Sequence, residues 1–150
     1  MADDAVQVTP GLRRARPGDA AQLHPLLDQL GYVMDIDRLA ARLAWFAADA
    51  SSPVWVAEYK GRVVGCIACH LTPPLHQVEP LGRITALVVD ENLRGLGIGK
   101  ALVNEADDFF RSQGCLAAEL TSSDHRLAAH AFYEARGYRA DKRRFLKSFD

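Results

Sequence analysis

The sequence has few cysteines, no long apolar run and no excess of charge of either sign. Its 150 residues include three cysteines, 18 Lys and Arg residues and 19 Asp and Glu residues, with a formal net charge of −1. No apolar stretch approaches the ~20 residues that span a bilayer, and the acidic N-terminus lacks the layout of a signal peptide. The lack of a basic block argues against nucleic acid as a partner. We therefore expect a cytoplasmic protein with neither a membrane nor a nucleic-acid partner.

An odd number of cysteines does not suit a disulfide framework. Two of them lie in Cys66-Ile67-Ala68-Cys69-His70, which spells the attachment sequence of c-type haem. The surrounding apolar segment is typical of a strand, and strand residues three apart face opposite sides. One haem could not easily bind both thiols, so we expect buried cysteines, no haem and no metal.

What the sequence does contain is a strand that runs into a glycine-rich turn and then a helix. Apolar and β-branched residues fill positions 84–89, which is typical of a strand covered on both faces. From Ile98 onward the apolar residues recur at helical spacing. Between them lies Arg94-Gly95-Leu96-Gly97-Ile98-Gly99, whose alternate glycines let several backbone amides point at one ligand. Such a turn at a helix N-terminus predicts a phosphate-binding site.

Two other phosphate-binding motifs do not fit this turn. A Walker A loop has Ser or Thr after its lysine, whereas Ala101 follows Lys100. A dinucleotide fingerprint reads Gly-x-Gly-x-x-Gly, whereas the glycines here alternate. The pattern Arg94-x-x-Gly97-x-Gly99 resembles the diphosphate-binding motif of the GNAT superfamily of N-acetyltransferases, which hold acetyl-coenzyme A in this turn.

A second stretch carries the same resemblance. Residues 122–138 begin with a serine/aspartate cap, continue as a short alanine-rich helix and end at a glycine. Arg126, His130 and Tyr133 follow at i, i+4 and i+7, so we expect them on one helix face. The segment looks like the fourth helix of the superfamily, except that Arg126 stands where asparagine is usual. The positions that match are Ala129, Phe132, Tyr133, Gly137 and Tyr138. Among GNAT members, the small bacterial aminoglycoside-type acetyltransferases are the most similar.

The order of the expected elements agrees with this resemblance. The pattern reads strand, two helices, three strands, helix, strand, helix and one or two final strands. It predicts an α/β fold with a mixed, mostly antiparallel sheet of six or seven strands and helices on both faces. The last strands are expected at 115–121 and within 138–149. Residues 1–10 are expected to form a loose leader, and residues 11–150 a single domain.

The resemblance implies a set of cofactor contacts. The pantetheine arm would pair with the backbone of Leu87 and Val89 where two strands splay apart, and an N–H near Val89 would stabilise the oxyanion. Tyr133 matches the tyrosine that acts as the acid toward the leaving thiolate. The implied acetyl-CoA contacts are Leu87, Val88, Val89, Arg94, Gly95, Leu96, Gly97, Ile98, Gly99, Lys100, Arg126, His130 and Tyr133.

The sequence defines the general base and the acceptor site less well. Residues 83–89 lack the glutamate that many relatives carry on this strand, so Glu119 is our candidate base. Other candidates are Asp124, His70, His130 and Glu79, and a water chain or an acceptor amine of lowered pKa would also serve. The candidate acceptor contacts are Tyr32, Met34, His76 and Glu79.

We therefore expect an acetyl-CoA-dependent enzyme that transfers an acetyl group directly to the primary amine of a small molecule. An aminoglycoside- or polyamine-like cation is the first guess, although no obvious acidic cluster is present to bind it. One alternative is a protein or peptide N-acetyltransferase, and another is a non-catalytic acyl-CoA-binding sensor. Because the family often forms dimers through its C-terminal strands, a homodimer is a further expectation.

Overall fold

Five strands form one sheet in the order β1-β2-β3-β4-β5 in the computed structural model, which describes residues 6–149. The first three neighbouring pairs are antiparallel, and β4 with β5 is parallel. The strands are β1 (Gly11–Arg14), β2 (Val54–Tyr59), β3 (Arg62–Thr72), β4 (Leu81–Val89) and β5 (Ala118–Glu119). The mixed, mostly antiparallel sheet that the sequence predicted is confirmed.

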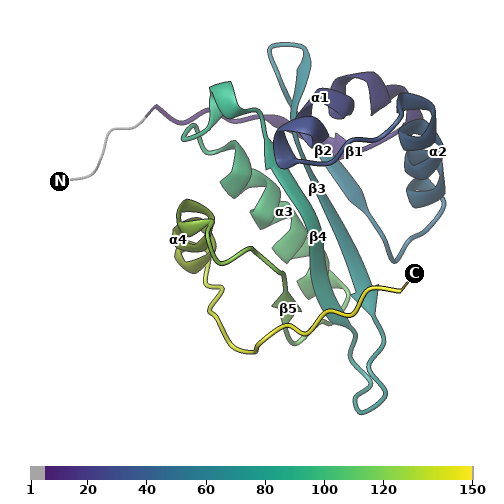
Figure 1. Ribbon diagram of the computed structural model, residues 1–150, viewed down its shortest axis with the longest axis vertical. Coiled ribbons are helices and arrows are strands. Elements are labelled where there is room, and N and C mark those ends of the chain that lie inside the picture. The colour runs from purple at the N-terminus through teal and green to yellow at the C-terminus, as the bar shows by residue number, and fades with distance from the viewer. Residues whose placement is uncertain (1–5, 150) are drawn as a thin grey trace.

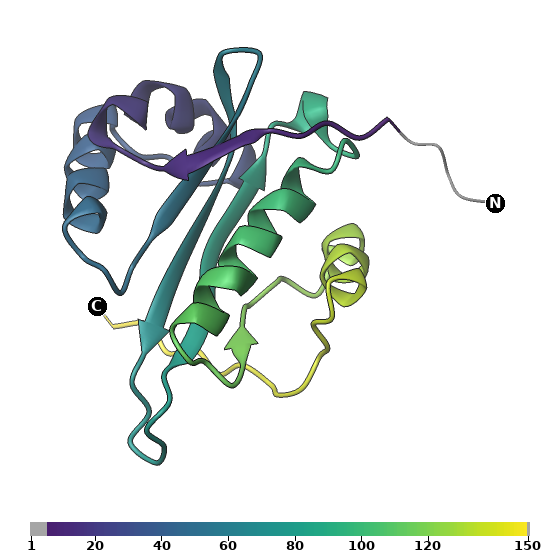
Figure 2. The ribbon, with the colours of Figure 1, turned by 180° about the vertical axis from the view of Figure 1, so that it is seen from behind.

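Helices cover both faces of this sheet. The α-helices are α1 (Ala20–Leu30), α2 (Ile36–Ala47), α3 (Ile98–Ser112) and α4 (Leu127–Ala135), and two 3₁₀ turns are η1 (Pro17–Asp19) and η2 (Glu91–Leu93). Figure 2 shows α3 lying along one face of the sheet, whereas α1 and α2 lie on the other face in Figure 1. None of the helices within residues 6–149 combines the length and apolar character needed to cross a bilayer.

Two buried clusters lie on the two faces of the sheet. Val56 packs with α1 and α2, whereas its neighbour Ala57 packs with α3, because successive strand residues point to opposite faces. Cys66 and Cys69 likewise lie in different clusters, as their spacing predicted. Burial raises the pKa of each thiol to about 12. Both cysteines therefore remain protonated and act as small apolar side chains.

Glycines let α3 approach the sheet closely. A Cβ added at Gly82 of β4 would lie 2.6 Å from the ring of Phe110, and one at Gly65 of β3 would lie 3.1 Å from Leu102. Larger side chains at these two positions would push α3 away from the sheet. This packing fixes the position of α3 and, with it, the turn at its N-terminus.

Several element boundaries follow local sequence signals. Gly31 ends α1 in the left-handed region at φ 98°, and the Asp35 side chain caps α2 by accepting from the backbone N–H of Asp37. Lys60 and Gly61 form the hairpin turn between β2 and β3 at φ 50° and 75°. The first helical segment begins as the 3₁₀ turn η1 and becomes α-helical only at Ala20.

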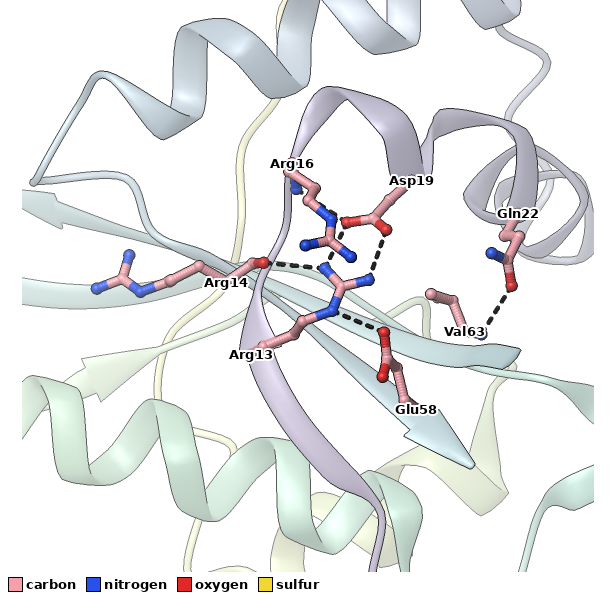
Figure 3. Close-up of polar contacts among 7 residues, drawn as sticks. All are labelled: Arg13, Arg14, Arg16, Asp19, Gln22, Glu58 and Val63. Carbon is pink, nitrogen blue, oxygen red and sulfur yellow. Dashed lines mark hydrogen bonds and ion pairs between the residues drawn. The ribbon is translucent and has the colours of Figure 1, made fainter. Parts of the chain in front are cut away.

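Arg13 ties β1 to β2 and to η1 (Figure 3). Its guanidinium donates to the two carboxylate oxygens of Asp19 over 2.7 and 2.8 Å, and its Nε donates to Glu58 over 2.7 Å. Asp19 also accepts from the backbone N–H of Arg16 at 2.9 Å, and its side chain is only 4% exposed. The paired guanidinium holds the pKa of Asp19 below its usual range. The ionised carboxylate therefore joins the start of the helical layer to the sheet.

The C-terminal part departs from the expected fold. Residues 138–149 contain no strand, so the described sheet has five strands and the prediction of six or seven was wrong. β5 covers two residues where 115–121 was expected. A strand needs a neighbour to bond with, and residues 139–149 are all exposed, with Phe145 at 89% and Phe149 at 84%. Apolar character in this segment predicted strands, but none of its apolar side chains is buried.

Candidate active site

β4 and β5 are joined at one end and then separate. Gly82 pairs with Ala118 and Arg83 pairs with Glu119, and these are the two registered pairs between the strands. The rest of β4, up to Val89, has no strand beside it on this edge among residues 6–149. Figure 1 shows the short β5 beside the lower part of β4 and α4 standing apart from the upper part. A long stretch of β4 therefore offers free backbone groups.

The register of β4 determines which backbone groups face this open edge. The N–H of Asp90 donates to the carbonyl of Val64 on β3 at 2.8 Å. Because the backbone groups of successive strand residues point to opposite edges, Val88 also faces β3, whereas Leu87 and Val89 face the open edge. An extended ligand with amide groups could bond to these two residues as an additional strand does.

β4 contains an extra residue at Thr85. Ala86 pairs with Ala68 of β3 and Ile84 pairs with Cys69, so Thr85 has no partner in the register. Bulges of this kind bend a strand and re-aim its side chains. The Thr85 side chain is exposed, and its Oγ1 donates to the Ala68 carbonyl at 3.2 Å. The bulge places Thr85 between the two cavities of the site.

The glycine-rich turn joins η2 to α3. Gly95 at φ 81° and Gly97 at φ 89° occupy the left-handed region that favours glycine. Gly97 precedes α3 directly, and a Cβ at Gly99 would lie 3.3 Å from the ring of Phe132 on α4. The first backbone amides of α3 have no acceptor within the helix, and the helix dipole favours an anion there. The turn can therefore hold a phosphate group.

The segment before β1 lies against this turn. The N–H of Val8 donates to the carbonyl of Leu96 at 2.8 Å. The Gln7 side chain packs over Gly97, where an added Cβ would collide with Gln7 Oε1. Residues 1–5 of the expected leader lie outside the described residues. Nothing in the sequence pattern had indicated a contact between residues 7–8 and the turn.

A cavity of about 140 Å³ lies between β4, the segment that follows β5 and α4, and we call it the α4 cavity. Tyr133 and Arg126 line it, as does Thr85 of the bulge. Burial raises the pKa of Tyr133, although the charge of Arg126 acts in the opposite direction. Arg126 is the one charged side chain in the lining, and no carboxylate or imidazole belongs to it. The lining residues are Leu30, Tyr32, Ile84, Thr85, Ala86, Leu87, Leu120, Thr121, Ser122, Ser123, Arg126, Ala129 and Tyr133.

A second cavity of about 200 Å³ lies between α1, α2 and the sheet, and we call it the α2 cavity. Met34, predicted as an acceptor contact, lines this cavity and not the first. Arg42 of α2 is the one charged side chain in its lining. Thr85 and Ala86 line both cavities, which are therefore neighbours on either side of the bulge. Sequence reasoning did not indicate this cavity, because most of its lining reads as ordinary core.

The structure brings only some of the predicted site residues together. Leu87, Arg126, Tyr133 and Tyr32 line the α4 cavity. His130, expected on the same face as Arg126, instead has its Nε2 2.9 Å from the carbonyl of Ser123 and lies outside the lining. The predicted serine/aspartate cap was wrong, since α4 starts after Arg126 without a side-chain cap.

The remaining candidate cofactor contacts differ in whether a ligand could reach their side chains or only their backbones. Arg94 and Lys100 flank the glycine turn with exposed side chains. Val88 and Ile98 are 4% and 1% exposed, so only their backbones could meet a ligand. Leu96 is half-buried, and its carbonyl already accepts from the N-terminal segment.

The base and loop candidates do not belong to the lining of either cavity. The Glu119 carboxylate is bound to Arg83 at 3.1 Å, and the ring Nδ1 of His70 lies 2.7 Å from Ser52 Oγ. His76 and Glu79 lie on the β3–β4 loop, which projects from the end of the sheet opposite the glycine turn (Figure 1). None of these residues, nor Asp124, lines either cavity. Within residues 6–149 no cluster of three or more His, Cys, Asp or Glu side chains could hold a metal ion.

A glycine turn at a helix start, beside a strand with an open edge, suits a phosphate-bearing carrier with an extended arm, as acyltransferases use. Residues 21–138 match the sequence profile of the acetyltransferase (GNAT) family. The chain therefore belongs to this family, and its enzyme class is that of the N-acetyltransferases.

Individual relatives agree with this assignment. An aminoalkylphosphonate N-acetyltransferase from Salmonella typhimurium is 32% identical over 142 residues, which cover 91% of this chain and 90% of the relative. A glucosamine 6-phosphate N-acetyltransferase from Trypanosoma brucei brucei is 38% identical over 97 residues, or 64% of each chain. A solved structure of a putative acetyltransferase from Agrobacterium tumefaciens matches with a TM-score of 0.84 at 28% identity. That match covers 93% of this chain and 99% of the other.

Proposed function

We propose that the protein transfers the acetyl group of acetyl-CoA directly to the primary amine of a small molecule. The observation that carries this proposal is the open edge of β4, which ends at the glycine turn on one side and passes Tyr133 on the other. The family to which the chain belongs uses acetyl-CoA as its co-substrate.

The residues fit such a carrier in three places. The first amides of α3 and the exposed Arg94 would bind the diphosphate. The backbone groups of Leu87 and Val89 would bond to the amides of the pantetheine arm. Lys100 and Arg126 supply further positive charge near the phosphates and the arm.

In the transfer, the lone pair of a neutral amine attacks the thioester carbonyl carbon, a C–N bond forms and the C–S bond breaks. Tyr133 would give its proton to the leaving thiolate, and its raised pKa keeps that proton in place at neutral pH. A backbone N–H of β4, expected at Val89, would stabilise the oxyanion. The proton of the amine would leave through water, which would return a proton to the Tyr133 phenolate, since the α4 cavity has no carboxylate or imidazole in its lining.

The acceptor is proposed to be a small amine. Two relatives are named for amines that carry a phosphonate or a phosphate. The lining of the two cavities contains two arginines and no carboxylate, so it gives no support to the aminoglycoside- or polyamine-like cation expected from the sequence. A cytoplasmic location and peptide acceptors stay untested predictions.

Thiol release from acetyl-CoA with a panel of amines and one N-terminal peptide tests the proposal. We expect turnover with at least one small amine and a large loss in Tyr133→Phe. Calorimetry with coenzyme A is the parallel measurement. Tight binding of coenzyme A without turnover for any acceptor would favour the acyl-CoA sensor, and no binding at all would reject the cofactor assignment.

We further propose that two chains associate through residues 139–149. Phe145, Leu146 and Phe149 are 75% to 89% exposed, and β5, the last strand of the sheet, covers only two residues. Light scattering after gel filtration should give the mass of a dimer. A Phe145→Asp, Phe149→Asp variant should then run as a monomer with an unchanged fold by circular dichroism.

A further inference from the structure

We infer that the acceptor amine has an apolar body that enters the α2 cavity and an anionic group that pairs with Arg42. This inference rests on the proposed function, because it names the acceptor class of the same site. The sequence suggested an acceptor with several positive charges. The acceptor inferred here instead carries a negative group at one end.

The first reason is that the two cavities adjoin at the bulge. Thr85 and Ala86 belong to the lining of both, and Tyr133 belongs to the α4 cavity. A molecule whose amine lies near Tyr133 can therefore extend past Thr85 beneath α1 and α2. The exposed Thr85 hydroxyl lies at this junction and already donates to Ala68.

The second reason is the chemistry of the α2 cavity. Its walls are aliphatic and aromatic side chains such as Leu27, Met34, Leu43 and Phe46. At about 200 Å³ it is larger than the apolar cavity of about 150 Å³ that can hold benzene. A phenyl ring or a short alkyl chain fits this space, whereas a hydroxylated or charged body would lose its hydration there.

The third reason is charge. The Arg42 side chain is exposed on α2, with its guanidinium 5.5 Å from the ring of Trp45. Among the described residues, no carboxylate forms an ion pair with it. Arg126 in the lining of the α4 cavity is positively charged as well. An acceptor with several ammonium groups would meet two guanidinium groups and no carboxylate, whereas a carboxylate or phosphonate would gain a paired contact.

Matched amines test this assignment. The probes are 4-(aminomethyl)benzoate, with a ring and an anion, benzylamine, with the ring alone, glycine, with the anion alone, and spermidine as the polycation. We expect kcat/KM for 4-(aminomethyl)benzoate to exceed that of benzylamine by at least about tenfold, as a charge-assisted hydrogen bond predicts. Glycine and spermidine should be poorer still.

Variants test whether Arg42 and the α2 cavity cause the preference for the amine with a ring and an anion. Arg42→Gln should abolish the advantage of the benzoate over benzylamine and leave KM for acetyl-CoA unchanged, and Arg42→Lys should retain part of it. Arg38→Gln, also exposed on α2 but outside the lining, is the matched control and should behave as the parent. Met34→Trp should fill the α2 cavity and raise KM for both ring-bearing amines.

A binding measurement separates this inference from the proposed function. Calorimetry of 4-(aminomethyl)benzoate in the presence of coenzyme A, where no transfer can occur, should show binding that weakens about tenfold in Arg42→Gln. If that holds without turnover, the acceptor class stands and the proposed reaction fails. If amines are acetylated but Arg42→Gln changes nothing, or spermidine is preferred, the inference is overturned.

Discussion

The guanidinium of Arg83 donates to the carboxylate of Glu119 over 3.1 Å, at the place where β4 and β5 stop pairing. The same guanidinium donates to Thr121 Oγ1 over 2.7 Å. These two contacts join β4 to the last residue of β5 and to the segment that follows it. The Arg83–Glu119 ion pair thus lies where β4 and β5 separate. It holds the Glu119 carboxylate outside the lining of the α4 cavity.

Glu119→Gln should keep most of the activity. The Glu119 side chain is 51% exposed, so the ion pair contributes only about 0–1 kcal/mol to the free energy of unfolding. We expect kcat within about threefold of the parent, because no proton transfer depends on this carboxylate. Steady-state kinetics at saturating acetyl-CoA measure this. A loss of a hundredfold or more would restore Glu119 as the general base.

Tyr133→Phe should lower kcat by about 10²–10⁴-fold and leave KM for acetyl-CoA nearly unchanged, as removal of a general acid does. Because burial raises the pKa of Tyr133 above its ordinary value of about 10, the phenol stays protonated through neutral and mildly alkaline pH. The pH profile of kcat should therefore show no fall from this group below about pH 10. An alkaline limb near pH 8 that is absent in Tyr133→Phe would contradict this assignment.

Substitutions in the glycine turn should weaken acetyl-CoA binding by different amounts. Gly95→Ala and Gly97→Ala both place a side chain in the left-handed region, at a cost of about 1–2 kcal/mol each. Gly97→Ala also collides with Gln7, whereas the space around Gly95 is open. Calorimetry should therefore show weaker binding in Gly97→Ala than in Gly95→Ala. Adding Gln7→Ala to Gly97→Ala should recover part of the lost affinity. If it does not, the contact between Gln7 and the methyl group added at position 97 is not the cause of the loss.

Arg13→Gln should lower the free energy of unfolding by about 3 kcal/mol, because it leaves the buried Asp19 carboxylate without its charged partner. Urea titration at pH 7 measures this. Glu58→Gln is the matched control, since the Glu58 side chain is 40% exposed and its loss should cost at most about 1 kcal/mol.

The same pair predicts a dependence on pH. The pKa of Asp19 is lower in the folded state than its value of about 3.9 in an unfolded chain. Its contribution to stability is therefore complete above about pH 4 and is lost as the pH falls through the folded-state value. Asp19→Asn should remove this part of the acid dependence, and an unchanged acid profile would show that other carboxylates cause it.

The strand, turn and helix around the glycine motif were predictable because local rules decide them. Alternate glycines at 95, 97 and 99 allow left-handed backbone, and the change from apolar run to helical spacing marks the start of α3. The same holds for the Lys60–Gly61 hairpin and for the end of α1 at Gly31. These features depend on neighbours in the sequence, which a pattern can read.

Features that depend on distant partners could not be read in this way. Glu119 pairs with Arg83, 36 positions away. The sequence alone could not show whether the Glu119 carboxylate would point into a cavity or away from it. The α2 cavity arises from imperfect packing of helices on a sheet, which apolar spacing does not encode. Apolar residues at 145, 146 and 149 suggested a strand, but strand formation requires a partner that the described chain does not supply.

The open edge of β4 has a consequence for handling the protein. Unpaired strand edges act as templates for association with other chains, and proteins usually cover them. If coenzyme A bonds along Leu87 and Val89, it protects this edge as well as supplying the reacting group. Preparations without it should aggregate more readily and melt at lower temperature than preparations supplemented with it, because a ligand that binds only the folded state shifts the equilibrium toward that state.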